Sequence, residues 1–123
     1  MALAATLLII INNYQMPDSS EPDITTYTTD YRAQVNFYRI DNSFHLFDDD
    51  KDGRSAVLQY SINENPVATA WNARGAGDNR RTRIVSLDLP GGVEIRYRVC
   101  TGEYSKTIYE EACSQWVNVT SAP

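Results

Sequence analysis

One stretch of the chain, residues 84–119, constrains the fold more than any other. Apolar and polar side chains alternate here on both sides of a Pro90-Gly91-Gly92 turn. Period two on each side of a turn is typical of half-buried antiparallel strands. The apolar positions are Val85, Leu87 and Leu89 before the turn and Val93, Ile95, Tyr97 and Val99 after it. Because the stretch also contains both cysteines, the rest of the chain has to pack against it.

The two cysteines predict a covalent clamp within this stretch. Cys100 ends the second alternating run and Cys113 begins a third predicted strand, so a bridge between them closes a segment of fourteen residues. In the loop-entropy description such a clamp contributes about 3 kcal/mol. We therefore predict a disulfide between Cys100 and Cys113 and an oxidising compartment, with a reduced pair in a cytosolic protein as the alternative.

The register of the last strand is the sharpest prediction from this stretch. If the two cysteines lie directly opposite each other, Trp116 faces the core while Val117 and Val119 face solvent. One extra residue in the last strand, a β-bulge, reverses all three side chains and places Trp116 outward over Arg96 and Arg98. Burying two valines outweighs the partial loss of one tryptophan, so we expect the bulged register.

The composition of the whole chain favours a β-sheet protein. Its 123 residues suffice for one domain, 42% of them are hydrophobic, and eight tyrosines stand against two methionines. Short alternating runs separated by turn signals predict strands at residues 31–38, 43–47, 55–62, 67–71, 81–89, 93–100 and 111–119. We predict an all-β, seven-stranded, two-sheet sandwich of the immunoglobulin or fibronectin type III kind, with one disulfide.

The N-terminal part differs in composition from the rest. Residues 1–30 read as an apolar segment followed by a flexible polar linker, and residues 31–123 as the β-sandwich domain. Residues 1–11 are apolar but too short to span a bilayer, so no transmembrane span is expected. They are a truncated secretory signal, the junction of a cleaved signal that leaves residues 5–11 as an edge strand, or a first core strand; the first two imply secretion.

Two motifs near the C-terminus resemble a known family of β-sandwich modules. The run Leu87-x-Leu89-Pro90-Gly91, followed by alternating Ile95, Tyr97 and Val99, resembles the E–F corner of fibronectin type III modules. Residues 117–123 resemble the last strand of those modules.

A second resemblance covers about residues 48 to 117. Four motifs are similar to those of small exported β-sandwich proteins of Streptomyces-type actinobacteria, to which no activity is assigned. In such bacteria, small members of secreted toxin assemblies bridge two larger subunits, a role that this resemblance suggests by analogy. The motifs are Asp52-Gly53-x-Ser55-Ala56-Val57, Trp71-Asn72-x-x-Gly75-Ala76-Gly77, Tyr97-Arg98-Val99-Cys100-Thr101-Gly102-Glu103-Tyr104 and Cys113-Ser114-x-Trp116-Val117.

An acidic turn at residues 48–53 is the candidate metal site. Asp48, Asp50 and Asp52 followed by Gly53 reproduce the opening half of a calcium loop. The bidentate glutamate is missing, because Gln59 stands where it should be. A solvated hairpin tip is the favoured interpretation and weak Ca²⁺ binding the alternative; no other cofactor is expected.

An arginine-rich segment at residues 72–83 is the candidate partner site. Arg74, Arg80, Arg81 and Arg83 crowd one region of a chain whose formal net charge is −5. The overall acidity argues against nucleic-acid or anionic-membrane binding, whereas the local arginines suit an acidic protein partner.

Counting residues argues against an enzyme. His45 is the only histidine and lies in a predicted strand, and Glu110 and Glu111 would point to opposite faces of an extended segment. We expect a secreted, non-catalytic protein-interaction module, an adaptor in a larger extracellular assembly. The alternatives are an enzyme inhibitor that presents the disulfide-bordered loop 101–112, or a glycan-binding module that uses Trp71 or Trp116.

Overall fold

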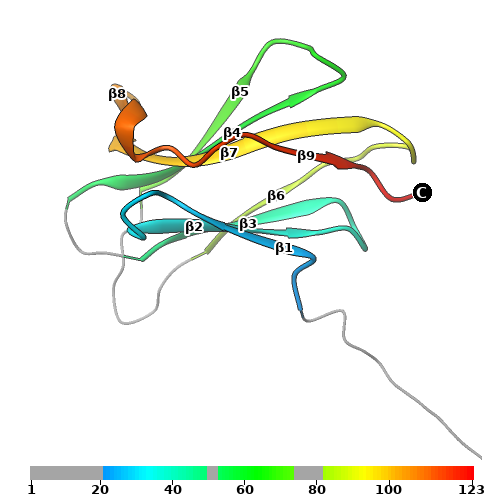
Figure 1. The fold of residues 1–123 in the computed structure, drawn as a ribbon, viewed down its shortest axis with the longest axis horizontal. Helices are drawn as coiled ribbons and strands as arrows, with labels where there is room; N and C mark the ends of the chain where they lie inside the picture. The colour runs from blue at the N-terminus through cyan, green and yellow to red at the C-terminus, as the bar shows by residue number, and fades with distance from the viewer. Residues whose placement is uncertain (1–20, 50–52, 74–81) are drawn as a thin grey trace, which may run out of the picture.

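Two antiparallel sheets make up the computed structural model, which describes residues 21–49, 53–73 and 82–123 (Figure 1). The first sheet has the order β1-β2-β3-β6, with β1 at Ile24–Tyr27, β2 at Ala33–Tyr38, β3 at Ser43–Asp48 and β6 at Thr82–Ser86. The second has the order β5-β4-β7-β8, with β5 at Ala68–Asn72, β4 at Ser55–Ile62, β7 at Glu94–Glu103 and β8 at Thr107–Tyr109. The last strand, β9 at Val117–Thr120, also pairs with β7. The predicted all-β, two-sheet architecture is confirmed.

The described residues hold nine strands instead of the predicted seven, and the last strand begins later than predicted. β1 lies inside the range 1–30 predicted to be linker, because a run of threonines around one isoleucine pairs well with β2 without showing a strong apolar pattern. β8 was missed because its three residues are too few to show an alternating pattern. The last strand begins at Val117, not Glu111, because Glu110–Ala112 form a short 3-10 helix. In these described ranges no helix has the length and apolarity needed to cross a membrane.

The main core lies between the two sheets and is built from alternate residues of each strand. Its centre is aromatic: the Tyr97 ring lies 4.8 Å from that of Phe44 and 6.0 Å from that of Phe37, measured between centroids. All three side chains are fully buried. Such ring pairs add stabilisation beyond their buried area, so β7 is joined to β2 and β3 of the opposite sheet at this point.

The predicted register of the last strand is confirmed. Val119 pairs with Ile95 and Val117 with Tyr97, and both valines pack against the main core. The Trp116 ring instead lies over two guanidinium groups, 4.3 Å from that of Arg96 and 4.7 Å from that of Arg98.

A backbone hydrogen bond locates the extra residue that sets this register. The N–H of Ser114 donates to the carbonyl oxygen of Val99, whereas Val117 pairs with Tyr97. Two residues therefore lie between Ser114 and Val117, opposite Arg98 alone. The predicted one-residue shift in register therefore occurs just before β9.

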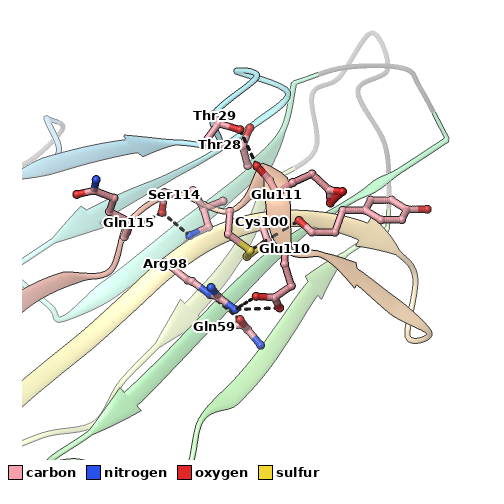
Figure 2. The surroundings of a disulfide bond; sticks show 12 residues. Thr28, Thr29, Gln59, Arg98, Cys100, Glu110, Glu111, Ser114 and Gln115 are labelled. Carbon is pink, nitrogen blue, oxygen red and sulfur yellow. Dashed lines mark hydrogen bonds and ion pairs between the residues drawn. A yellow bond between two sulfur atoms is a disulfide. The ribbon is translucent and has the colours of Figure 1, made fainter.

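The predicted disulfide between Cys100 and Cys113 is present, with a Cα–Cα distance of 4.1 Å. It lies on the outer face of the second sheet, because Cys100 pairs with Val57 and the alternation of β7 turns both away from the main core. These residues form a second, small apolar cluster with Trp71 and Ile108 packed against it. The disulfide thus does not join the two sheets. It fastens residues 103–113, here called the flap, over the outside of one sheet (Figure 2).

Polar contacts hold the flap at both of its sides (Figure 2). Thr29, in the turn between β1 and β2, donates its N–H to the Ala112 carbonyl and its hydroxyl to the Glu111 carbonyl, both at 3.1 Å. The Arg98 guanidinium contacts both carboxylate oxygens of Glu110 at 3.1 Å. The flap therefore also connects the two sheets at one end of the sandwich.

The two segments that resemble fibronectin type III modules meet in the structure. The Ser121 hydroxyl donates to the Pro90 carbonyl at 2.7 Å and accepts from the Val93 N–H at 2.8 Å. A Cβ on Gly91 would lie 2.6 Å from the Cα of Pro123, so only glycine fits at this turn. The turn before β7 and the end of the chain are therefore mutually fitted.

Removing the disulfide should lower the free energy of unfolding. We expect Cys100→Ala/Cys113→Ala to cost about 3 kcal/mol, because the unfolded chain regains the entropy of the closed loop. Urea unfolding of both proteins, with and without reductant, measures the difference, and reductant should leave the variant unaffected. Two alkylated thiols in the native protein, found by intact mass without reductant, would contradict the disulfide.

Tyr97 provides a pH-dependent test of the core. Its hydroxyl is buried close to the Thr26 side chain, and none of the described residues forms a hydrogen bond of ordinary geometry with it. Burial raises the pKa of Tyr97 to about 12, and the Thr26 side chain only partly offsets this rise. The folded state therefore holds the phenolic proton more tightly than the unfolded state does, and stability falls as pH rises from about 10 to 12.

We expect Tyr97→Phe to reduce the fall in unfolding free energy at alkaline pH. The part due to Tyr97 is at most about 2–3 kcal/mol, because its pKa differs by about two units between the folded and unfolded states. Urea unfolding at pH 8, 10 and 11.5 measures it. Tyr31→Phe is the control, since that side chain is exposed. Equal slopes in the wild type and the Tyr97 variant would mean that the hydroxyl ionises as easily in the folded chain as in the unfolded one.

Candidate functional site

An open groove of about 460 Å³ lies where the edge of one sheet approaches the edge of the other. β5 is the outermost strand of the second sheet on this side and β6 the outermost strand of the first (Figure 1). Residues of both strands and of the flap line the space. The lining residues are Trp71, Asn72, Ala73, Thr82, Arg83, Ile84 and Tyr104.

Two aromatic residues form one wall of this groove. The alternation of β5 buries Asn72, which donates to the Leu46 carbonyl at 2.9 Å, and so turns Trp71 to the outer face. Tyr104 lies in the turn between β7 and β8 and is 57% exposed. The Trp71 and Tyr104 rings meet edge to face with their centroids 5.8 Å apart.

Gly102 makes this aromatic contact possible. A Cβ at this position would lie 3.1 Å from the Trp71 ring and would collide with the Thr107 carbonyl oxygen. The absence of a side chain therefore lets β8 fold back on β7 while Trp71 packs beneath the flap.

Arg83 forms the opposite wall and is tied across the groove. Its Nη1 donates to the Trp71 carbonyl at 2.8 Å, so β6 and β5 are linked between the two sheets. Ile84 follows on the same strand and is 58% exposed. An exposed isoleucine beside a tryptophan, a tyrosine and an arginine combines the residue types that dominate binding energy at protein interfaces.

The other predicted partner-binding residues flank this groove in the sequence. Arg74, Arg80 and Arg81 lie outside the described residues. The segment that carries them joins Ala73 to Thr82, and both of these residues line the groove. The structure therefore places Arg83 in the groove and attaches the arginine-rich segment to it at both ends.

Of the three aspartates predicted as ligands in the acidic turn, the structure describes Asp48. Asp48 ends β3 with 3% of its surface exposed, so this carboxylate is buried and not solvated. The strand alternation turns it toward the interior with Phe44 and Leu46. Asp50 and Asp52 lie outside the described residues. Among those described, no three His, Cys, Asp or Glu side chains group as metal ligands.

The residues considered for catalysis have other contacts. The His45 ring packs on Tyr38, with centroids 4.3 Å apart, and its strand neighbours are Asn36 and Ile84. Glu110 and Glu111 lie in the 3-10 helix, where the extended geometry predicted for them does not apply, and Glu110 contacts Arg98.

The segment considered for inhibition is a hairpin. Residues 101–112 contain the end of β7, all of β8 and the 3-10 helix. Thr101, Gly102 and Ala112 are buried, so exposure is greatest near the turn at Tyr104. The segment is thus fastened to the sheet near both of its ends and exposed at its turn.

Sequence reasoning did not single out Tyr104 or Ile84. Each carried a usable signal: Tyr104 is a large aromatic between Glu103 and Ser105 in a turn, and Ile84 is an apolar residue directly after the arginine-rich segment. What the sequence does not reveal is that the two meet in one groove, because they are brought there by separate strand pairings.

Comparisons of the chain with protein-family models, with curated proteins and with solved structures gave no match.

Gly102→Ala tests how the groove wall is built. We expect the variant to lose about 1–3 kcal/mol of stability, the usual cost of forcing atoms into a packed site. Urea unfolding followed by tryptophan fluorescence measures it, with Glu103→Ala, an exposed neighbour, as the control. Equal stability of the two variants would mean that the flap does not need the close approach at Gly102.

Proposed function

We propose that this chain is a secreted, non-catalytic protein-interaction module and that an acidic surface of its partner binds the groove between β5 and β6. The observation that carries the proposal is the gathering of Trp71, Tyr104, Ile84 and Arg83 around one open groove. Tryptophan, tyrosine and arginine are the residues that most often dominate interface energetics. A partner that inserts an apolar side chain against Trp71 and Tyr104 would desolvate this wall.

The charge of the partner follows from the arginines. The chain as a whole carries a formal net charge of −5, so the four arginines at residues 74–83 are a local exception. An acidic partner would be attracted to this end and repelled elsewhere, which favours one orientation of docking. Three of the four arginines join the groove only through the sequence, so a charge-reversal experiment is the direct test.

We further propose that the sandwich is of the immunoglobulin or fibronectin type III kind. With β2 as the first strand, the first, second and fifth strands share one sheet and the third, sixth and seventh share the other. That division matches strands A, B and E against C, F and G of immunoglobulin domains. The fourth strand, β5, pairs with β4, whereas constant-type immunoglobulin domains place it in the other sheet.

The disulfide supports the secreted location. Disulfides persist in oxidising compartments and are rare in the cytosol. A role as an adaptor between two larger subunits of an exported assembly rests on the resemblance to small exported actinobacterial proteins. An adaptor needs two binding surfaces, of which the groove would be one.

A glycan is a second candidate for the same groove. The exposed Tyr104 ring beside Trp71 offers an apolar platform, and Asn72, Thr82 and Arg83 supply polar groups around it. An enzyme inhibitor that presents residues 101–112 is the remaining alternative, since the disulfide holds this hairpin rigid and its turn is exposed.

Matched baits test the interaction. Wild-type protein and Arg80→Glu/Arg81→Glu are immobilised and exposed to the native secretome, and retained proteins are identified and re-tested in purified form. We expect the charge reversal to weaken binding on the order of tenfold, and high salt to weaken wild-type binding, because exposed arginines act through screened electrostatics. Arg39→Glu, on a different turn, is the control.

A second pair of outcomes separates the candidates. Tyr104→Ser should abolish partner binding while lowering the free energy of unfolding by at most about 0.5–1.5 kcal/mol, since only the edge-to-face contact with Trp71 is lost. Binding that survives both the charge reversal and Tyr104→Ser would exclude this groove as the partner site. Retention on a glycan array that Tyr104→Ser removes, with no acidic protein retained, would favour the glycan.

A further inference from the structure

A second surface, on the opposite side of the sandwich from the β5–β6 groove, ends in an unprotected edge strand. Among the described residues β1 pairs with β2 only, and its four residues Ile24–Tyr27 include no charge and no proline. Natural edge strands are usually blunted by charges, prolines or bulges, because an open edge invites pairing with another strand. Pro22 and Asp23 directly precede β1, so the open edge consists of the four residues Ile24–Tyr27.

The backbone N–H and C=O groups of β1 point alternately toward β2 and toward the open edge. The Thr28 N–H donates to the Ala33 carbonyl at 3.0 Å, and positions along an antiparallel pair alternate between bonded and non-bonded. With the observed register, Ile24 and Thr26 direct their backbone groups to β2. The N–H and C=O groups of Thr25 and Tyr27 therefore point to the open edge.

An apolar groove of about 390 Å³ accompanies this edge. Tyr27 and Tyr31 are 42% and 71% exposed, and their rings lie 5.3 Å apart, so they present a continuous aromatic surface. Ser114, Gln115 and Val117, just before and at the start of β9, form the other side. A strand added to β1 would therefore cover aromatic surface as well as gain backbone hydrogen bonds.

The sequence supplies a matching strand. Residues 5–11, Ala-Thr-Leu-Leu-Ile-Ile-Ile, are apolar, rich in β-branched side chains and free of charge. At about 3.3 Å per residue they reach roughly 23 Å when extended, more than the length of β1. Burying such an apolar segment is favourable, and at a sheet edge its side chains would pack in the groove while its backbone forms hydrogen bonds with the edge strand.

The connection between this segment and β1 favours the same chain as the donor. Residues 12–23 separate residue 11 from the start of β1 at Ile24, so a segment that turns back at this point runs antiparallel to β1. Twelve residues are ample for such a return, and a connection of this length gives the attached segment an effective concentration in the millimolar range. A second copy of the chain would have to compete with that concentration.

We propose that residues 5–11 dock as an additional antiparallel strand on β1 of their own chain and cover Tyr27 and Tyr31. Of the three interpretations of the N-terminus, this one makes the segment a permanent part of the first sheet. The inference is independent of the β5–β6 groove, and its test does not involve a partner.

Amide hydrogen exchange of the full chain tests the docking. We expect the Thr25 and Tyr27 amides to be protected about 100-fold or more relative to an unstructured peptide. Ile9→Pro removes a ladder donor from the added strand and should return both amides to nearly unprotected exchange. Ser19→Pro, in the connecting segment, is the matched control and should leave the protection unchanged.

Three results would overturn the proposal. Thr25 and Tyr27 amides that exchange equally fast in the wild type and in Ile9→Pro would show an open edge. Light scattering between about 10 and 200 μM measures whether the chain dimerises, and a tethered strand would already be fully docked at these concentrations. Protection that appears only as a dimer forms would assign the added strand to a second copy. Loss of residues 1–11 from the secreted protein, seen by intact mass, would identify them as a signal remnant.

Discussion

The pairing of β4 with β7 is the constraint on which the rest of the structure depends. It runs from Ser55 opposite Gly102 to Ile62 opposite Ile95, the longest register in the described chain. Because side chains alternate along both strands, one register fixes two faces at once. Leu58 and Tyr97 enter the main core, while Val57 and Cys100 form the base of the second cluster on the outside.

The disulfide belongs to the second cluster and therefore has a different structural role from the disulfide of antibody domains. In antibody domains the disulfide joins the two sheets through the core. Here Cys100 and Cys113 lie outside the sandwich, and the bond secures a flap whose turn carries Tyr104 beside Trp71. Covalent stabilisation is therefore applied to the wall of the β5–β6 groove, where a small apolar cluster alone would hold a hairpin weakly. A rigid wall loses little conformational freedom when a partner binds, which is the physical basis of preorganised interfaces.

The two sides of the sandwich are asymmetric in chemistry. The β5–β6 side combines aromatic and arginine side chains that suit a separate acidic partner, whereas the β1–β9 side offers uncharged backbone edge and tyrosine rings that suit an apolar strand. A chain that pairs the open edge of β1 with its own segment, and leaves the β5–β6 groove exposed, would avoid uncontrolled edge pairing. The two proposals together describe a module with one closed edge and one available site.

The sequence alone determined the features that depend on local pattern. Alternation gave the all-β architecture, the core face of β7 and, through the competing burial of Val117, Val119 and Trp116, the register of the last strand. The cysteine spacing gave the disulfide. Each of these follows from side-chain periodicity or from contacts between neighbouring strands in the chain.

Only the tertiary structure decided which distant segments meet. β1 is too short and too rich in threonine to stand out as a strand, and it forms because β2 offers a partner with six alternating residues. The β5–β6 groove lies between the edges of two different sheets, and Ile84, Trp71 and Tyr104 reach it through three different pairings. The hydrogen bond from Ser121 to the Pro90 carbonyl likewise joins segments that are distant in the sequence. Pairing between strands remote in sequence depends on the energy of the whole packed arrangement, and no local pattern encodes it.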